Sequence, residues 1–109
     1  MGPKLEIADQ NRNLWDLEME RHVRQVLTQA MTLNGRVLMR QLLLHGKIEC
    51  HLQFIPEIPM DVQTREMDIA VKSGIIRRQE ETAGLRRTYF VVNPDYWAVL
   101  KRVLPQVIT

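Results

Sequence analysis

The sequence predicts an α+β fold in which helices surround one small antiparallel sheet. Apolar residues recur at helical spacing in four separate segments of the chain. Two β-prone runs near the C-terminus flank a short polar stretch that contains a glycine, which predicts a β-hairpin. Strands joined by so tight a turn must pair antiparallel, so the strand–helix alternation of a parallel sheet is not expected.

The first helix is expected over residues 14–31, where the apolar residues form one face and leave the other for charges. Asn13 has the side chain of a helix N-cap, and it is expected to start this helix. Residues 1–13 are polar and are expected to form a tail, which can be disordered, ahead of a single domain that spans residues 14–109.

A second helix is expected over residues 34–45, capped by Thr32 or Asn34 and ended by Gly46. Its apolar residues cover much of its circumference, which predicts burial on more than one side. The alternating segment that follows, residues 47–52, predicts a short strand.

The third helix is expected over residues 60–73, after a proline-containing loop at 53–59, with Asp61 as its N-cap. Its predicted buried stripe consists of Val62, Met67, Ala70 and Val71. Two strands should follow, "IIRRQE" and "LRRTYFVVN", closing the core through Ile75, Ile76, Phe90 and Val92. A fourth amphipathic helix should begin near Pro94, and Pro105 should kink or end it.

Composition places the chain among globular proteins. Its 109 residues suit one domain, and 45% of them are hydrophobic. With Cys50 as the one cysteine, no disulfide can form within the chain, which favours a reducing compartment: the nucleus, or the cytosol of a prokaryotic or viral host. The apolar runs are too short to span a bilayer, so no membrane partner is expected.

Helices followed by a hairpin and one further helix form the order of a winged helix-turn-helix domain, with a three-helix core, a C-terminal wing and an extra C-terminal helix. Three stretches, "NLWDLEMERHVRQ", "NGRVLMRQLLLHGKIE" and "AVKSGIIRRQEETAGLRRTYFVVNPDYWAVLKRVL", resemble a winged-helix domain of the third-largest subunit of RNA polymerase III. The α subunit of general transcription factor E has a comparable wing. The resemblance implies a non-catalytic role in transcription initiation, through contacts with other polymerase subunits and promoter DNA.

Candidate nucleic-acid-binding residues lie on the third helix and on the wing. Segment 61–73 sums to −1, which opposes phosphate contact by the helix and favours a solvated or protein-facing surface. The wing, residues 77–87, sums to +2, although its arginines can also pair with glutamates across the strands. The candidates are Arg65, Lys72, Arg77, Arg78, Arg86 and Arg87.

A second candidate surface is aromatic. The terminal helices carry more large apolar residues than a three-helix core needs, and Trp and Tyr are favoured anchors of protein interfaces. A groove between these helices is expected to take a partner helix or a neighbouring winged helix. Its candidate residues are Trp15, Met19, Tyr96 and Trp97.

No sequence pattern indicates an enzyme, and no cofactor is expected. A phosphate-binding glycine loop, a nucleophile elbow and a metalloprotease helix are all missing from the sequence. His45, Cys50 and His51 do not make a metal site, because neighbouring strand residues point to opposite faces and a second ligand pair is missing.

The resemblance, taken with the two candidate surfaces, implies a transcription-machinery module that mainly scaffolds other subunits, with double-stranded DNA as a secondary partner. One alternative is a DNA-binding regulator that uses its wing arginines. Another is a winged helix that forms homodimers. The sequence leaves the oligomeric state open.

Overall fold

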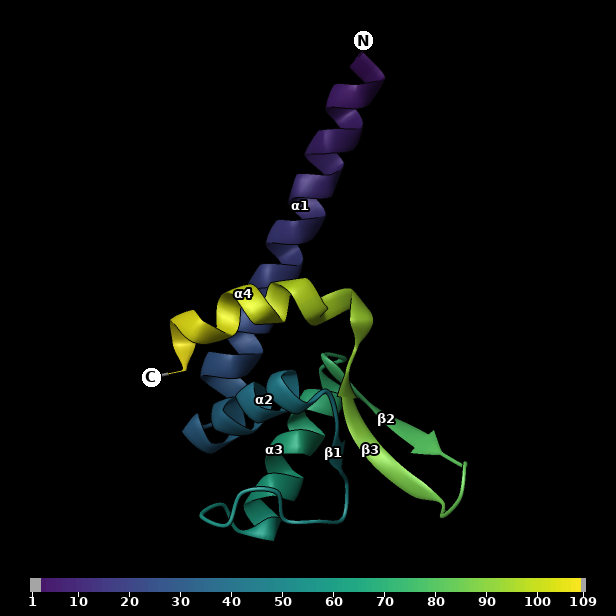
Figure 1. Ribbon diagram of the computed structural model, residues 1–109. Coiled ribbons are helices and arrows are strands. Elements are labelled where there is room, and N and C mark those ends of the chain that lie inside the picture. The colour runs from purple at the N-terminus through teal and green to yellow at the C-terminus, as the bar shows by residue number, and fades with distance from the viewer. Residues whose placement is uncertain (1–2, 109) are drawn as a thin grey trace.

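The structure, a computed structural model, describes the backbone of residues 3–108 and the side chains of residues 14–108. Within that range the chain has an α+β fold with four α-helices and one three-stranded antiparallel sheet (Figure 1). No described helix is both long enough and apolar enough to cross a membrane. The elements in chain order are α1 Pro3–Gln25, a π-helical turn Val26–Ala30, α2 Leu33–His45, β1 Ile48–Glu49, α3 Met60–Lys72, β2 Ile76–Glu81, β3 Arg87–Val92, a 3₁₀ turn Pro94–Tyr96 and α4 Trp97–Val107.

Helix α1 begins earlier than the sequence predicts. It starts at Pro3, so Asn13 lies inside the helix and does not cap it. Residues 1 and 2 of the expected tail lie outside the described residues. Figure 1 shows the N-terminal part of α1 running away from the other elements, while its last turns lie beside α4. Those last turns bury Val23 completely, and Leu27 in the π-helical turn is equally buried.

Helix α2 lies close to its predicted bounds. Thr32 is its N-cap residue, and Gly46 ends it with a φ of 83°, a left-handed conformation that glycine adopts without strain. Leu38, Met39 and Leu42 are fully buried. The expected burial on several sides is only partly met, because the neighbouring Leu44 is 68% exposed.

The sheet has the order β1-β3-β2, with β3 in the centre. Phe90 of β3 lies opposite Ile48 on one side and Arg78 on the other, and Ile76 lies opposite Val92. Ile75, Ile76, Phe90 and Val92 are all buried, as predicted. Strand β1 is shorter than the predicted 47–52, because the chain turns away after Cys50 donates its backbone N–H to the Thr88 carbonyl at 2.9 Å.

Helix α3 differs from its prediction in two respects. Its N-cap residue is Pro59 and not Asp61, which lies in the first turn. Met67 and Ala70 are buried as expected, whereas Val62 and Val71 are only half-buried. The fully buried positions that the prediction missed are polar, Gln63 and Glu66, and both are 0% exposed.

Asn93 joins the sheet to α4. Its side-chain Oδ1 accepts the Asp95 N–H at 3.1 Å and so caps the 3₁₀ turn that leads into α4. Its Nδ2 donates to the carbonyl of Gly74 at 3.0 Å, at the turn between α3 and β2. Pro105 does not end α4, which continues to Val107. One asparagine therefore fixes where α4 starts relative to α3 and the hairpin.

Candidate functional site

The cations predicted to contact nucleic acid are already paired within the chain. Lys72 Nζ lies 2.9 Å from Asp68 Oδ2, and Arg78 Nη2 lies 3.7 Å from Asp68 Oδ1. The hydrogen bond from Lys72, with a smaller contribution from Arg78, lowers the pKa of the Asp68 carboxyl. The structure thus brings Lys72 and Arg78 together, but around an acid that neutralises part of their charge.

The other wing arginines point to different partners. Arg77 donates to the Asn93 side-chain oxygen at 3.0 Å, and Arg86 pairs with Glu80. Arg87 Nη1 lies 4.0 Å from Glu49 Oε2. In the register of the hairpin Arg77 lies opposite Val91 and Arg78 opposite Phe90, so the two side chains leave opposite faces of the sheet, as strand alternation predicts.

The outer face of α3 is less acidic than its sequence indicates. Arg65 Nη2 lies 3.7 Å from Glu66 Oε1, but the Glu66 carboxylate is completely buried and does not reach the surface. The exposed or half-exposed charges left on α3 are two acids and two bases: Asp61, Asp68, Arg65 and Lys72. The sum of −1 for segment 61–73 includes Glu66, so the expectation of a net negative outer face was wrong and the surface of α3 is electrically balanced.

The aromatic candidates divide between two hollows. Trp15, Met19 and Tyr96 line a small hollow of about 220 Å³ together with Glu18 and His22. His22 Nε2 donates to the Ser73 carbonyl at 2.8 Å, and its ring lies 5.9 Å from that of Tyr96. His22 therefore ties α1 to the end of α3 and to the start of α4. The fourth candidate, Trp97, lines a different and larger hollow.

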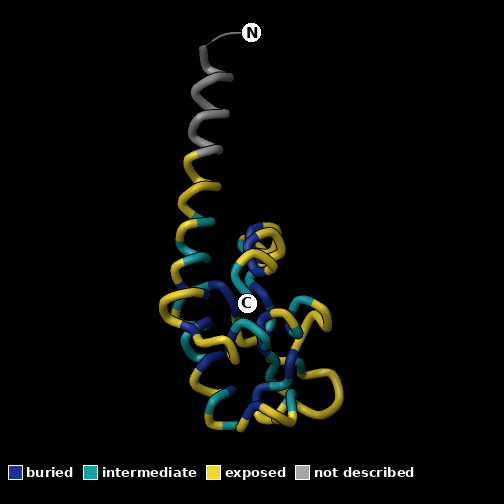
Figure 2. Tube along the Cα trace, turned by 90° about the vertical axis from the view of Figure 1, so that its left-hand side faces the viewer, coloured by how far each residue is buried: buried dark blue, intermediate teal, exposed yellow. Residues whose placement is uncertain are grey.

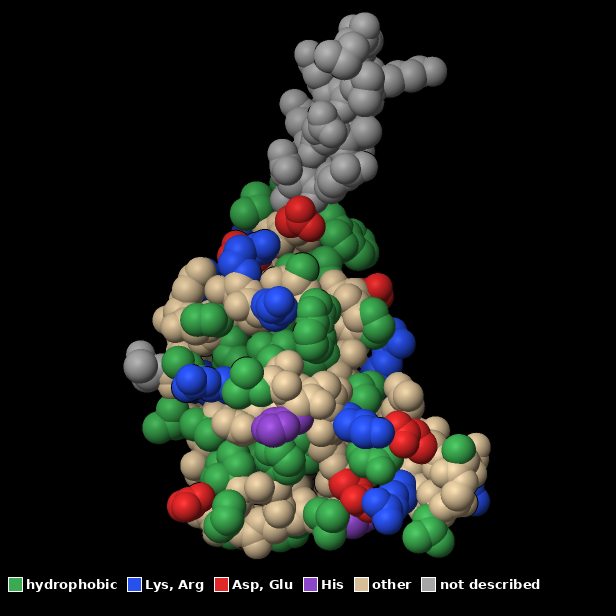
Figure 3. Space-filling model, viewed as in Figure 1, with side chains coloured by type: hydrophobic (Ala, Val, Ile, Leu, Met, Phe, Trp, Pro, Cys, Tyr) green, Lys and Arg blue, Asp and Glu red, His purple; other side chains and the backbone are tan. Residues whose placement is uncertain are grey.

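This larger hollow, the α2/α4 groove, has a volume of about 570 Å³. Leu44 is 68% exposed and Trp97 is 38% exposed, although both are large and apolar. Figure 3 shows hydrophobic side chains gathered over α4 and α2, with Lys and Arg among them. The residues that line the groove are Arg40, Leu43 and Leu44 of α2, Trp97, Lys101, Leu104 and Pro105 of α4, and Ile108.

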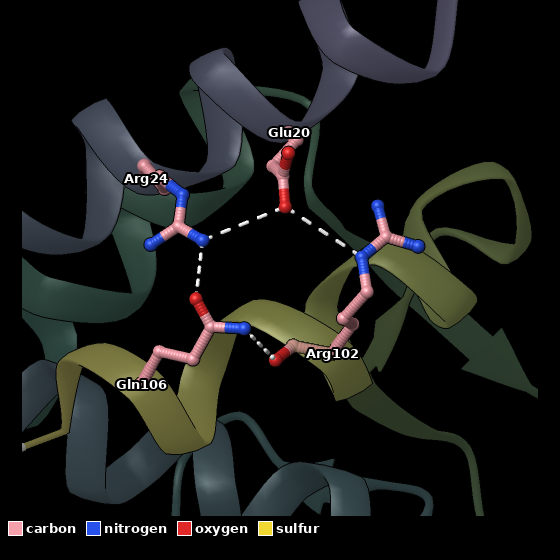
Figure 4. A network of polar contacts seen from close by, with 4 residues as sticks. All are labelled: Glu20, Arg24, Arg102 and Gln106. Atoms are coloured by element: carbon pink, nitrogen blue, oxygen red, sulfur yellow. Dashed lines mark hydrogen bonds and ion pairs between the residues drawn. The ribbon is translucent and has the colours of Figure 1, made fainter. Parts of the chain in front are cut away.

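The groove exists because α4 has two occupied sides and one open side. Its lining residues recur at helical spacing and form one stripe along the helix. On another side, Arg102 Nε lies 3.6 Å from Glu20 Oε1, and Gln106 accepts a hydrogen bond from Arg24 (Figure 4). Leu100 and Val103 face the core and are fully buried. Contacts with α1 and with the core thus hold α4 so that the groove stripe stays open.

Most of the groove could not be assigned from sequence. Trp97 was predicted as an interface residue, whereas Leu43 and Leu44 belong to the apolar circumference of a helix that was predicted to be buried on more than one side. One signal was present: helix α2 is apolar around much of its circumference, more than one core face requires. Which of its sides stays uncovered depends on where α4 packs, and this is a property of the tertiary fold.

Cys50 is buried and has no described partner that would make it a metal ligand. Within the described residues no group of three or more His, Cys, Asp and Glu side chains lies close enough to hold a metal ion. Burial raises the pKa of the Cys50 thiol, with Arg78 acting weakly in the opposite direction. The arrangement keeps the thiol protonated near neutral pH.

We therefore expect Cys50 to resist thiol reagents in the folded protein. Its reaction with a disulfide reagent at pH 8 should be slower by at least about tenfold than in urea-unfolded chain, because the thiolate is the reactive form. The raised pKa also implies a pH-dependent contribution of the Cys50 thiol to the free energy of unfolding. This contribution is present below the pKa of the thiol in the unfolded chain and is lost as the pH rises through its pKa in the folded chain. Equal labelling rates in the folded and unfolded chain would contradict this prediction.

The chain matches no protein-family model, no curated protein and no solved structure. The α2/α4 groove and the paired cations are the features of the chain that bear on its function.

Proposed function

We propose that the chain is a winged helix-turn-helix domain that serves transcription machinery as a non-catalytic protein-interaction module. Support for the winged helix comes from the order of the elements: the β2–β3 hairpin directly follows α3, and β1 completes the sheet beside β3. Support for a transcription role comes from the sequence resemblance to the polymerase III subunit, which also implies a nuclear location.

The exposed α2/α4 groove is the feature that best supports a role in binding another protein. Burying apolar surface is worth about 25 cal/mol per Å², so exposed Leu44 and Trp97 side chains are a source of binding free energy. Arg40 and Lys101 add positive charge to the same groove. The ligand that fits is an amphipathic helix, presented by another subunit of the machinery, with an apolar face and carboxylates that meet these two cations.

Retention of purified RNA polymerase III on the immobilised domain tests this role. Leu44→Asp places a carboxylate in the apolar groove and is expected to reduce retention by at least about tenfold, since an unpaired charge is costly to bury. Leu44 is largely exposed, so the substitution should leave the fold intact. Leu85→Asp, at a 76% exposed position on the wing tip, is the matched control and should keep wild-type retention. Equal retention by all three proteins would exclude the groove.

DNA binding is expected to be weak. Each of the six candidate cations already contacts an acid or an amide within the chain, and moving it to a phosphate would break that contact. Fluorescence anisotropy with duplex DNA should give a dissociation constant in the non-specific range, about 10⁻⁴ to 10⁻⁶ M at physiological salt. Affinity well below micromolar that disappears in Arg86→Ala/Arg87→Ala would instead favour a DNA-binding regulator.

A further inference from the structure

The exposed part of α1 carries large apolar side chains that the domain itself does not cover. Leu14, Trp15 and Leu17 are 60%, 68% and 56% exposed. They lie on α1 before its contact with α4, where Figure 2 shows the helix exposed on successive turns. At 100° per residue these three side chains spread around more than one side of the helix. Such a helix is normally buried against a partner.

One face of this segment complements the α2/α4 groove. Leu14, Trp15 and Glu18 share that face, because residues i, i+1 and i+4 lie within about 100° of one another on a helix. The face therefore offers two large apolar groups with a carboxylate between them. The groove offers apolar side chains together with the cations Arg40 and Lys101. Both surfaces are therefore apolar, and they carry charges of opposite sign.

The segment cannot fill the groove of its own chain. Helix α4 turns Arg102 and Gln106 toward α1, where they meet Glu20 and Arg24 (Figure 4). Trp97 and the other groove residues occupy a different side of α4, facing away from that contact. The exposed part of α1 also leads away from the domain and not back over α4 (Figure 1). A second copy of the chain can place its α1 segment in this groove, which the same copy cannot do.

We infer that the α2/α4 groove of one copy binds the exposed α1 segment of a second copy, residues 14–18, and that the exchange is reciprocal. This inference rests on the proposed function of the groove as a protein-docking site and names a second occupant of it, besides a helix of another subunit. A two-fold axis would form both contacts at once, each burying Trp15 of one copy beside Trp97 of the other. The carboxylate of Glu18 would then lie near Lys101 and Arg40 of the opposite copy.

Light scattering coupled to size-exclusion chromatography, over a range of protein concentrations, tests the exchange. The wild-type chain should show a monomer–dimer equilibrium. Glu18→Lys should raise the dimer dissociation constant by at least about tenfold, because two symmetric contacts change from attraction to repulsion. Asp16→Lys is the matched control, since it makes the same change of charge about 160° away around the helix and should leave the constant within about threefold.

A charge exchange makes the test specific for the groove. Lys101→Glu alone should weaken self-association, because it opposes Glu18 of the other copy. Glu18→Lys mixed with Lys101→Glu should recover a mixed dimer, as should the double variant Glu18→Lys/Lys101→Glu on its own. Circular dichroism of each variant establishes that it is folded. Recovery in the mixture cannot arise from a folding defect.

Two outcomes would overturn the exchange: a wild-type chain that stays monomeric at every concentration, or a dimer that responds equally to Glu18→Lys and Asp16→Lys. Neither outcome bears on the proposed function, which is measured separately by the loss of polymerase retention in Leu44→Asp. A monomeric chain whose retention still depends on Leu44 would remove the second copy as occupant and keep the groove as a docking site.

Discussion

Gln63→Leu is expected to lower the free energy of unfolding by about 3 kcal/mol, despite replacing a polar residue by an apolar one of similar size in the interior. Gln63 is 0% exposed, and both ends of its amide are used. Nε2 donates to the Leu52 carbonyl at 2.7 Å, and Oε1 accepts the Phe54 N–H at 2.9 Å. Leucine would leave both backbone groups without a partner. Urea unfolding followed by circular dichroism measures the loss.

The control for Gln63 is the same change at an exposed helical position. Gln25→Leu on α1 should alter the free energy of unfolding by no more than about 0.5 kcal/mol, since Gln25 is exposed. If Gln63→Leu had an equally small effect, the two hydrogen bonds would not be what fixes the loop between β1 and α3.

Glu66→Ala is expected to cost about 3 kcal/mol, because it removes a buried carboxylate that caps another helix. Glu66 Oε1 accepts the backbone N–H of Thr32 at 3.1 Å and also the Thr32 hydroxyl, at the N-terminus of α2. A negative charge is favourable at that end of the helix dipole. Glu66→Gln keeps an oxygen acceptor of the same reach and should lose only about 1 kcal/mol. Urea unfolding of the two variants should therefore give clearly separated midpoints.

Gly35 provides an independent check on the position of the Glu66 carboxylate. A Cβ atom at Gly35 would lie 2.7 Å from Glu66 Oε2 and 2.7 Å from the Met31 methyl carbon, so both side chains must move. Gly→Ala inside a helix is ordinarily stabilising. Here Gly35→Ala should destabilise, because the added Cβ would push the Glu66 carboxylate away from the position in which it accepts the Thr32 N–H. A stabilised Gly35→Ala variant, or equal stability of Glu66→Ala and Glu66→Gln, would contradict the capping role.

The fold could largely be predicted because its signals are local. Helical periodicity placed α2 and α4, and alternation around a glycine-containing turn placed the β2–β3 hairpin and its buried residues. Gly46 was likewise predicted to end α2 from its residue type and its position after the apolar segment. The start of α1 could not be placed this way, because Asn13 has the side chain of an N-cap although it lies inside the helix.

Residue type alone could not predict which polar side chains are buried. Gln63 and Glu66 are three residues apart and share the inner face of α3, but polarity alone assigns them to the surface. Their burial is favourable only because the 52–54 loop and the start of α2 present backbone groups to them. The groove could not be predicted for the same reason, because it depends on how α4 packs beside the exposed Leu44. The pairing of the wing arginines depends on strand register in the same way.

The proposed docking of a protein partner in the α2/α4 groove is tested most directly by site-specific photocrosslinking. A photoreactive phenylalanine derivative would replace Leu44 in one sample and Leu85 in another, and each would be irradiated with purified RNA polymerase III and duplex DNA. Both positions are exposed to a similar extent, at 68% and 76%. We expect a covalent adduct with a polymerase subunit from position 44 and none from position 85. Adducts from position 85 alone, whether to protein or to DNA, would contradict it and assign the contact to the wing.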